Sequence, residues 1–132
     1  MIHRFNPASM APPFSPYSQG VEVPAGARTI YVAGQVGVSP DGSLCEGIEE
    51  QTAQAFRNIQ IVLRERGMEL EDLVETRTYM VDPDHIPGYR AGRAKVLKTG
   101  EGGPRPAVAM LFVTRLARPE WLIEIVAVAA KD

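Results

Sequence analysis

The chain has 132 residues, of which 45% are hydrophobic and 23% charged, and its formal net charge at pH 7 is −2. This length and composition predict a single globular domain over residues 1–132, large enough to bury a core. A slightly acidic chain without a basic stripe is not typical of nucleic-acid-binding domains, so we expect no nucleic-acid partner. Cys45 is the only cysteine, which excludes an intrachain disulfide. With neither a signal-peptide core nor a long apolar run, we expect a cytoplasmic protein with no membrane partner.

The first strand is predicted at TIYVAGQV, residues 29–36, where Ile30 and Val32 occupy alternate positions. Gly34 interrupts this alternation, and a glycine inside a strand indicates a bulge or a close approach of another group. The proline-rich segment 7–16 predicts a loop, and PDG within residues 38–47 predicts a turn.

A helix is predicted at residues 48–66. Acidic residues in its first turn and basic residues in its last turn favour the helix dipole, and Gly67 stands where a C-terminal cap belongs. One apolar stripe predicts the face that packs on the sheet: Ala53, Phe56, Ile59 and Leu63. A strand at residues 74–81 follows and ends at Asp82-Pro83.

A second helix is predicted from Asp82, which can cap it with Pro83 in the first turn, to about Lys98, before Gly100. Two glycines inside this helix each cost roughly 1 kcal/mol relative to alanine. The helix must therefore be held mainly by packing. The two glycines are Gly88 and Gly92.

The last two strands, predicted at residues 107–114 and 121–130 around a turn at Arg118-Pro119, are apolar on both faces. Two helices can cover only one face of a small sheet, so a monomer would leave a large apolar patch on the other. We therefore expect a homo-oligomer with clefts between subunits, where ligand sites often lie. In the first of these strands, one face carries Val108, Met110 and Phe112, and the other carries Ala109, Leu111 and Val113.

Few residues suggest chemistry by themselves. Glu124 is the only charge between residues 121 and 130, and such a carboxylate is either a structural anchor or a site residue. Tyr17 in FSPYSQG is either packing or part of a site. Arg90 stands out from a basic run that otherwise predicts a solvated face, because arginine binds carboxylates in a bidentate manner. The sequence predicts no nucleophile at Cys45 and no metal site at the two isolated histidines.

Several short motifs occur in an order that resembles the RidA (YjgF-like) family of enamine and imine deaminases, also linked to endoribonuclease L-PSP. They are PYSQG, AGQV, PA, RLA and IEI, with a helix, a strand and a helix between AGQV and PA. The resemblance covers nearly the whole chain. It implies an α+β, chorismate-mutase-like fold, in which a mixed sheet has two helices on one face, and a homotrimer with three intersubunit clefts. The activity it implies is cofactor-free hydrolysis of 2-aminoacrylate and its imine tautomers to 2-keto acids and ammonia.

The resemblance also implies site residues. In the family, an arginine of the PAR motif binds the substrate carboxylate, but that position is Val108 here, and the site cysteine two residues on is Met110. The helix asparagine of the family aligns with Arg90. Arg105 lies three residues before Val108, about 10 Å along an extended chain, so it cannot occupy the same place, although its side chain stays a candidate ligand contact. Three positions match the family: Tyr17, Gly34 and Glu124.

We therefore expect a homotrimer that binds a small organic ligand or metabolite without a cofactor, and whose usual deaminase activity is weak or absent. The alternative is a hydrolytic imine or enamine deaminase, or a related hydrolase, on another substrate. In that alternative Arg90 and Glu124 are the catalytic pair, as anion receptor and as the group that orients water. RNA cleavage is a further hypothesis, which neither the charge nor a motif of this chain supports. A chaperone-like or purely structural trimer is another, and the sequence does not separate it from the ligand-binding hypothesis.

Overall fold

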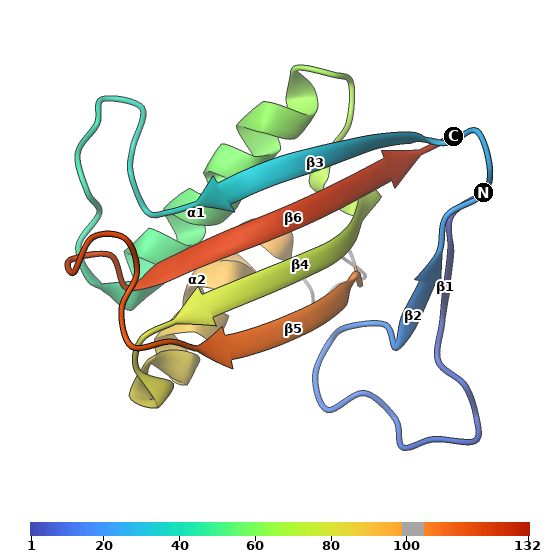
Figure 1. Ribbon diagram of the computed structural model, residues 1–132, viewed down its shortest axis with the longest axis horizontal. Helices are drawn as coiled ribbons and strands as arrows, with labels where there is room; N and C mark the ends of the chain where they lie inside the picture. The colour runs from blue at the N-terminus through green and yellow to red at the C-terminus, as the bar shows by residue number, and fades with distance from the viewer. Residues whose placement is uncertain (99–104) are drawn as a thin grey trace.

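The computed structural model describes residues 1–98 and 105–132. Its main sheet contains four strands in the order β3-β6-β4-β5 (Figure 1). β4 and β5 are parallel, whereas β6 is antiparallel to both of its neighbours. The sheet is therefore mixed, as expected. The strands are β3 (Arg28–Gln35), β4 (Leu73–Met80), β5 (Ala107–Phe112) and β6 (Ile123–Lys131).

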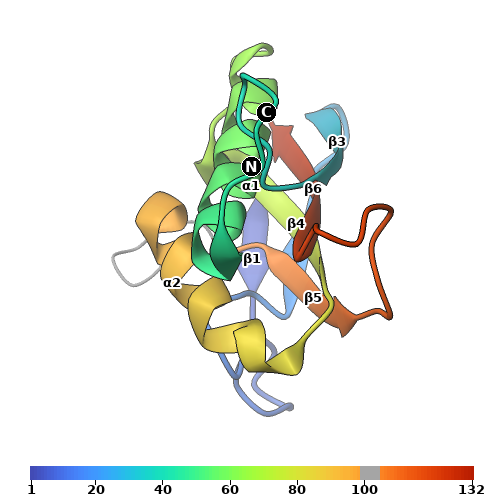
Figure 2. The ribbon, with the colours of Figure 1, turned by 90° about the vertical axis from the view of Figure 1, so that its left-hand side faces the viewer.

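Two helices, α1 (Gly47–Arg64) and α2 (Ile86–Leu97), lie on the same side of this sheet (Figure 2). Short 3-10 turns, η1 (Leu70–Asp72) and η2 (Pro83–His85), precede β4 and α2. The expected α+β arrangement with two helices on one face is confirmed. The sequence did not predict a separate pair of strands, β1 (His3–Phe5) and β2 (Gly20–Glu22), because three residues are too short to show alternation.

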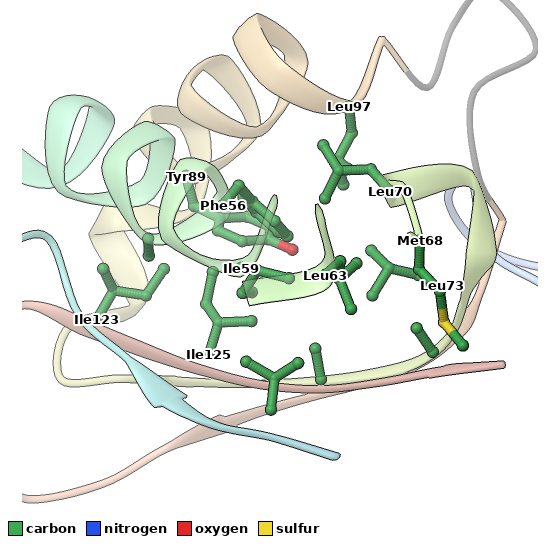
Figure 3. Packing of buried hydrophobic residues seen from close by; sticks show 14 of the residues in the cluster. Phe56, Ile59, Leu63, Met68, Leu70, Leu73, Tyr89, Leu97, Ile123 and Ile125 are labelled. Carbon is green, nitrogen blue, oxygen red and sulfur yellow. The ribbon is translucent and has the colours of Figure 1, made fainter. Parts of the chain in front are cut away.

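The core lies between α1 and the sheet (Figure 3). The predicted apolar stripe of α1 is fully buried, with Phe56, Ile59 and Leu63 each 0% exposed. From the sheet, Ile123 and Ile125 face the same space. Burying side chains of this size contributes roughly 1.5–3 kcal/mol each, so this contact holds the helix on the sheet.

The two glycines of α2 face α1 at the helix crossing. A Cβ built at Gly92 would lie 2.8 Å from the Cβ of Thr52, and one at Gly88 would meet the side chain of Ile48. The glycines therefore let the two helices approach closely. This packing is what offsets their poor helix propensity.

Several element ends differ from the prediction. α1 ends at Arg64 instead of residue 66, but Gly67 has a φ of 75° and the Met68 N–H donates to the Leu63 carbonyl at 3.0 Å, so the expected glycine cap is present. β5 ends at Phe112 instead of residue 114.

β6 begins at Ile123 instead of residue 121, because the preceding residues belong to a loop held by Gln51, whose side chain accepts the Leu122 N–H at 2.9 Å. Asp82 accepts the Asp84 N–H at 2.9 Å, so it caps a 3-10 turn that leads into α2. α2 ends at Leu97, and Gly100, expected beyond the helix, lies outside the described residues.

The side of the sheet away from the helices is largely apolar, as the two-sided strands predicted, although it also carries the charged pair Glu75 and Arg77 of β4. Residues 123, 125 and 127 of β6 are buried under the helices and alternate with half-buried residues that point the other way. We call this second surface the open face. Tyr31 is 80% exposed there and Leu111 43%. Register pairs place these apolar residues on the open face: Tyr31, Tyr79, Ala109, Leu111, Val126 and Val128.

Over the described residues, no helix is long and apolar enough to cross a membrane.

Candidate functional site

A pocket of about 510 Å³ lies between α2, β5 and the loop that precedes β2. We call it the α2–β5 pocket. Its floor is apolar and its α2 side is cationic. The residues that define its character are Tyr17, Thr78, Arg90, Arg93, Val108 and Met110.

Val108 and Met110 form the β5 side of this pocket. In the parallel register, Val108 pairs with Thr76 and Met110 pairs with Thr78, and both threonines are buried on the helix side of the sheet. Because side chains of register partners point to the same face, the two β5 residues also face the helices. The sequence placed Val108 and Met110 together on one strand face, and the structure agrees.

Tyr17 reaches the α2–β5 pocket from a loop that is tied to the start of β5. The hydroxyl of buried Ser18 donates to the Arg105 carbonyl at 2.6 Å, and the Ser18 N–H donates to the Pro106 carbonyl at 3.1 Å. These two bonds connect segments that are far apart in sequence. They fix Tyr17 beside β5.

The basic residues of α2 point in two directions. Arg90 and Arg93 are three residues apart, so they share one helix surface, and both line the pocket. Lys95 instead points to α1, where its ammonium lies 2.6 Å from the Glu49 carboxylate and also pairs with Glu50. This ion pair lowers the pKa of the Glu50 carboxyl, and the two acidic residues raise the pKa of Lys95.

Arg93 is a pocket residue that the sequence analysis did not single out. Its guanidinium donates to the Pro16 carbonyl at 3.3 Å, next to Tyr17, and is half-buried. Its spacing of three from Arg90 was the available signal. Arg90 is exposed at the pocket edge.

Arg105 does not line the α2–β5 pocket. Its backbone carbonyl is engaged by Ser18, and its side chain is half-buried just before β5. The structure therefore uses this position to join the Tyr17 loop to the strand.

Glu124 and Gly34 lie on the open face, on the other side of the sheet from the pocket. Glu124 pairs in register with Tyr79 of β4, whereas the adjacent Thr78 faces the helices. The register of β3 shifts between Val32 and Gln35, so the expected irregularity at Gly34 is present. Within one chain the structure thus brings Glu124 to Gly34 and does not bring either to Tyr17.

The chemistry available in the α2–β5 pocket is that of an anion-binding site. Two arginines and two tyrosines, Tyr17 and Tyr89, line it, and no carboxylate or histidine does so among the described residues. The part of the chain that the structure describes also contains no group of three or more histidine, cysteine, aspartate or glutamate residues arranged to hold a metal ion.

Comparison with known proteins agrees with this architecture. The sequence model of the family described as Endoribonuclease L-PSP matches residues 8–131. A mouse protein named 2-iminobutanoate/2-iminopropanoate deaminase is 34% identical over 118 residues, which cover 88% of this chain and 82% of the mouse protein. A RutC family protein of Aquifex aeolicus is 39% identical over 71 residues, and this match spans 53% of the chain and only 54% of that relative.

Solved structures show the same fold. A Yersinia pestis protein of the conserved Rid protein family, YyfB, of unknown function, superposes with a TM-score of 0.82 at 36% identity and covers 98% of both chains. E. coli TdcF with bound serine superposes with a TM-score of 0.73 over 98% of this chain and 100% of TdcF, at 20% identity, which speaks for the fold alone. With the family match over residues 8–131, these findings show that the chain belongs to the Rid (YjgF, L-PSP) family.

Proposed function

We propose that this single-domain protein binds a small organic ligand in the α2–β5 pocket, and that its 2-imino acid deaminase activity is weak or absent. The observation that carries this proposal is the apolar β5 side of the pocket, where Val108 and Met110 stand. The family resemblance implies an arginine at position 108, bound to the substrate carboxylate. Losing such a charge-assisted contact costs roughly 1.5–3 kcal/mol, or about tenfold to more than a hundredfold in rate.

We further propose that the protein is a homotrimer and that each cleft is completed by the open face of a neighbouring subunit. The apolar composition of that face supports an interface, because burying Tyr31, Val126 and Val128 away from water would stabilise the association of subunits. The same assembly would bring Gly34 and Glu124 of a neighbour toward Tyr17. The resemblance groups these residues in one site, and separate subunits would reconcile that grouping with their positions on opposite faces.

A second candidate function is hydrolytic deamination of a different imine or enamine. The observation in its favour is that Arg90 lines the same pocket as Val108, so a carboxylate receptor on α2 is available. In this candidate, Arg90 binds the anionic group and the neighbour's Glu124 orients the attacking water. The pocket would then keep the chemistry of the family with a relocated anion site.

The test is release of ammonia and pyruvate from 2-aminoacrylate generated in situ by a serine dehydratase. Wild type, Val108→Arg and Arg90→Ala are compared with a reaction without this protein. Lys98→Ala is the matched control, because Lys98 belongs to the same basic run but does not line the pocket. We expect wild type to match the no-protein rate and Val108→Arg to exceed it.

Each other outcome has a distinct meaning. Acceleration by wild type that Arg90→Ala abolishes and Lys98→Ala preserves would establish the second candidate and overturn the first. If wild type accelerates the reaction and Arg90→Ala accelerates it equally, both candidates fail. Val108 would then not prevent deaminase activity, and Arg90 would not be the anion receptor.

A further inference from the structure

Gln51, near the start of α1, is a buried amide whose side chain holds two segments that are far apart in sequence. Its Oε1 accepts the Leu122 N–H at 2.9 Å, in the segment that leads into β6. Its Nε2 donates to the Cys45 carbonyl at 3.2 Å, in the segment that follows β3, and lies 3.5 Å from the Glu120 carbonyl. Gln51 is only 2% exposed, so water cannot readily replace these backbone partners.

The chain that follows β3 also packs directly against α1 at this residue. A Cβ built at Gly37 would lie 2.5 Å from the Cα of Gln51, and the Gly37 carbonyl accepts the Cys45 N–H at 2.8 Å. An apolar side chain at position 51 would leave the Leu122 N–H and the Cys45 carbonyl without their present partners. The amide is therefore an anchor for both segments.

The two anchored segments flank the contact between Gly34 and Glu124. β3 ends at Gln35 and β6 begins at Ile123, and antiparallel pairing puts both positions at the same end of the sheet (Figure 1). On the β3 side, strand pairing only partly fixes this end, because the register shifts between Val32 and Gln35. Bonds from outside the sheet are therefore needed to hold the start of β6 against the end of β3.

We propose that Gln51 is a positioning residue, which sets the place of the Glu124 carboxylate over Gly34 by fixing the chain two residues before Glu124. Gln51 does not line the α2–β5 pocket, so it acts through the backbone and not by touching a ligand. The placement rests on the contacts of the amide. Its consequence for catalysis rests on the proposed function, in which Glu124 orients the attacking water.

Gln54 offers a matched control on the same helix. It is also buried, at 9% exposure, and its Nε2 donates to the Asn58 Oδ1 at 2.9 Å. This bond stays within α1, whereas the bonds of Gln51 leave the helix for the segments beside β3 and β6. Gln54→Met thus removes a buried amide from α1 without removing a bond to the start of β6.

The first measurement is carboxyl carbon NMR of Glu124 in wild type, Gln51→Met and Gln54→Met, with Glu124→Gln to assign the resonance. Methionine has a length close to that of glutamine but makes no amide hydrogen bonds. We expect both glutamine variants to unfold at lower denaturant concentration than wild type. Only Gln51→Met should shift the Glu124 resonance. Hydrogen exchange at the Leu122 amide should become about twofold to tenfold faster in Gln51→Met, which is the value of one neutral hydrogen bond.

The second measurement is the rate of 2-aminoacrylate hydrolysis in the Val108→Arg background. Adding Gln51→Met should lower kcat by roughly tenfold to a hundredfold and leave KM nearly unchanged, because a displaced Glu124 no longer places the water. Adding Gln54→Met should leave both constants unchanged. If Gln51→Met does not fold, Gln51→Asn replaces it, with Gln54→Asn as its control, because the shorter amide no longer reaches Leu122.

The outcomes separate this inference from the proposed function. An unchanged Glu124 resonance in Gln51→Met, or equal shifts in the two glutamine variants, would leave Gln51 a purely structural role and overturn the inference. A shifted resonance with unchanged kcat would keep the placement but remove the catalytic consequence. An inactive Val108→Arg variant would contradict the role proposed for Val108, and the Glu124 resonance would still decide the role of Gln51.

Discussion

The side chain of Glu124 lies directly over Gly34 on the open face. A Cβ at position 34 would come within 2.7 Å of the Glu124 Cδ, so only glycine leaves room for the carboxylate there. The bulge in β3 and the glycine inside it thus set the position of Glu124, the only charged residue of β6 before Lys131.

Gly34→Ala should displace the Glu124 carboxylate at little cost in stability. The obstacle is the far end of a flexible side chain, so we expect the free energy of unfolding to change by less than about 1 kcal/mol. Gly37→Ala is the matched control, because its Cβ would lie 2.5 Å from the Cα of Gln51 in α1, and moving a helix backbone should cost about 1–3 kcal/mol. Denaturant unfolding measures both, and carboxyl NMR of Glu124 reports the displacement. Equal losses in the two variants would contradict this account.

Ser18→Ala should loosen the loop that carries Tyr17. The substitution removes the 2.6 Å bond from the buried hydroxyl and leaves the Arg105 carbonyl without that donor, which should cost about 1–2 kcal/mol. Ser15→Ala removes a hydroxyl from the exposed edge of the same loop and should be neutral. Unfolding curves give the stability, and hydrogen exchange at the Ser18 amide gives the loop opening. Identical exchange in Ser18→Ala and wild type would show that the hydroxyl does not anchor the loop.

The Lys95 ion pairs should stabilise the α1–α2 contact over a defined pH range. Because Lys95 lowers the Glu50 pKa below its ordinary value of 4.5, this contribution is present above pH 4.5 and is lost as the pH falls through the lowered value. Because the acidic pair raises the Lys95 pKa above 10.5, the contribution of Lys95 is complete below pH 10.5 and is lost as the pH rises through the raised value.

Lys95→Met should therefore be less stable than wild type at pH 7 and equal to it near pH 2.5. These side chains are substantially exposed, so 1 M NaCl should also reduce the difference at pH 7. Thermal melts at the two pH values and two salt concentrations measure this. A difference that persists at pH 2.5 would assign the effect to packing of the lysine stem.

The elements with long periodic patterns were predictable from sequence, and the short or irregular ones were not. The stripe that includes Phe56 and Leu63 repeats at the helix period, so it predicted both α1 and its buried face. The glycines of α2 predicted that packing holds this helix, but they did not identify its partner. The neighbour they approach, Thr52 in α1, is distant in sequence. The β1 and β2 pair left no pattern at all.

The candidate site was predictable in parts for similar reasons. Strand alternation placed Val108 and Met110 on one face, but a basic helix run does not say which members face a pocket, and Arg93 was missed. Glu124 alternates with the buried Ile123 and Ile125, which puts it on the open face. Its grouping with Tyr17 came from family resemblance, and one chain alone does not bring the two together.

The family is described as Endoribonuclease L-PSP, so RNA cleavage is worth testing. We expect this protein not to cleave RNA. The chain carries a net charge of −2, and the cations of the α2–β5 pocket face a small cavity instead of a track for a phosphate backbone. Single-stranded RNA incubated with a ribonuclease-free preparation should remain intact. Arg90→Ala purified in parallel is the control, since cleavage shared equally by both preparations would indicate a contaminant. Cleavage by wild type alone would overturn the expectation.

Val128→Lys should convert the proposed trimer into a monomer. Val128 pairs with Tyr31 of β3 and with Glu75 of β4 on the open face, so a lysine there would put an ammonium group into the proposed interface, where its loss of water opposes association. Ile61→Lys is the matched control, because Ile61 is an apolar residue 52% exposed on α1, away from the open face. Light scattering should give three times the chain mass of 14.4 kDa for wild type and Ile61→Lys, and the chain mass for Val128→Lys.

Because the proposed clefts need a neighbour's Glu124, the Val128→Lys monomer should also lose any deaminase activity that wild type or Val108→Arg shows. A wild-type monomer, or a monomeric variant that keeps this activity, would mean that the open face does not complete the site.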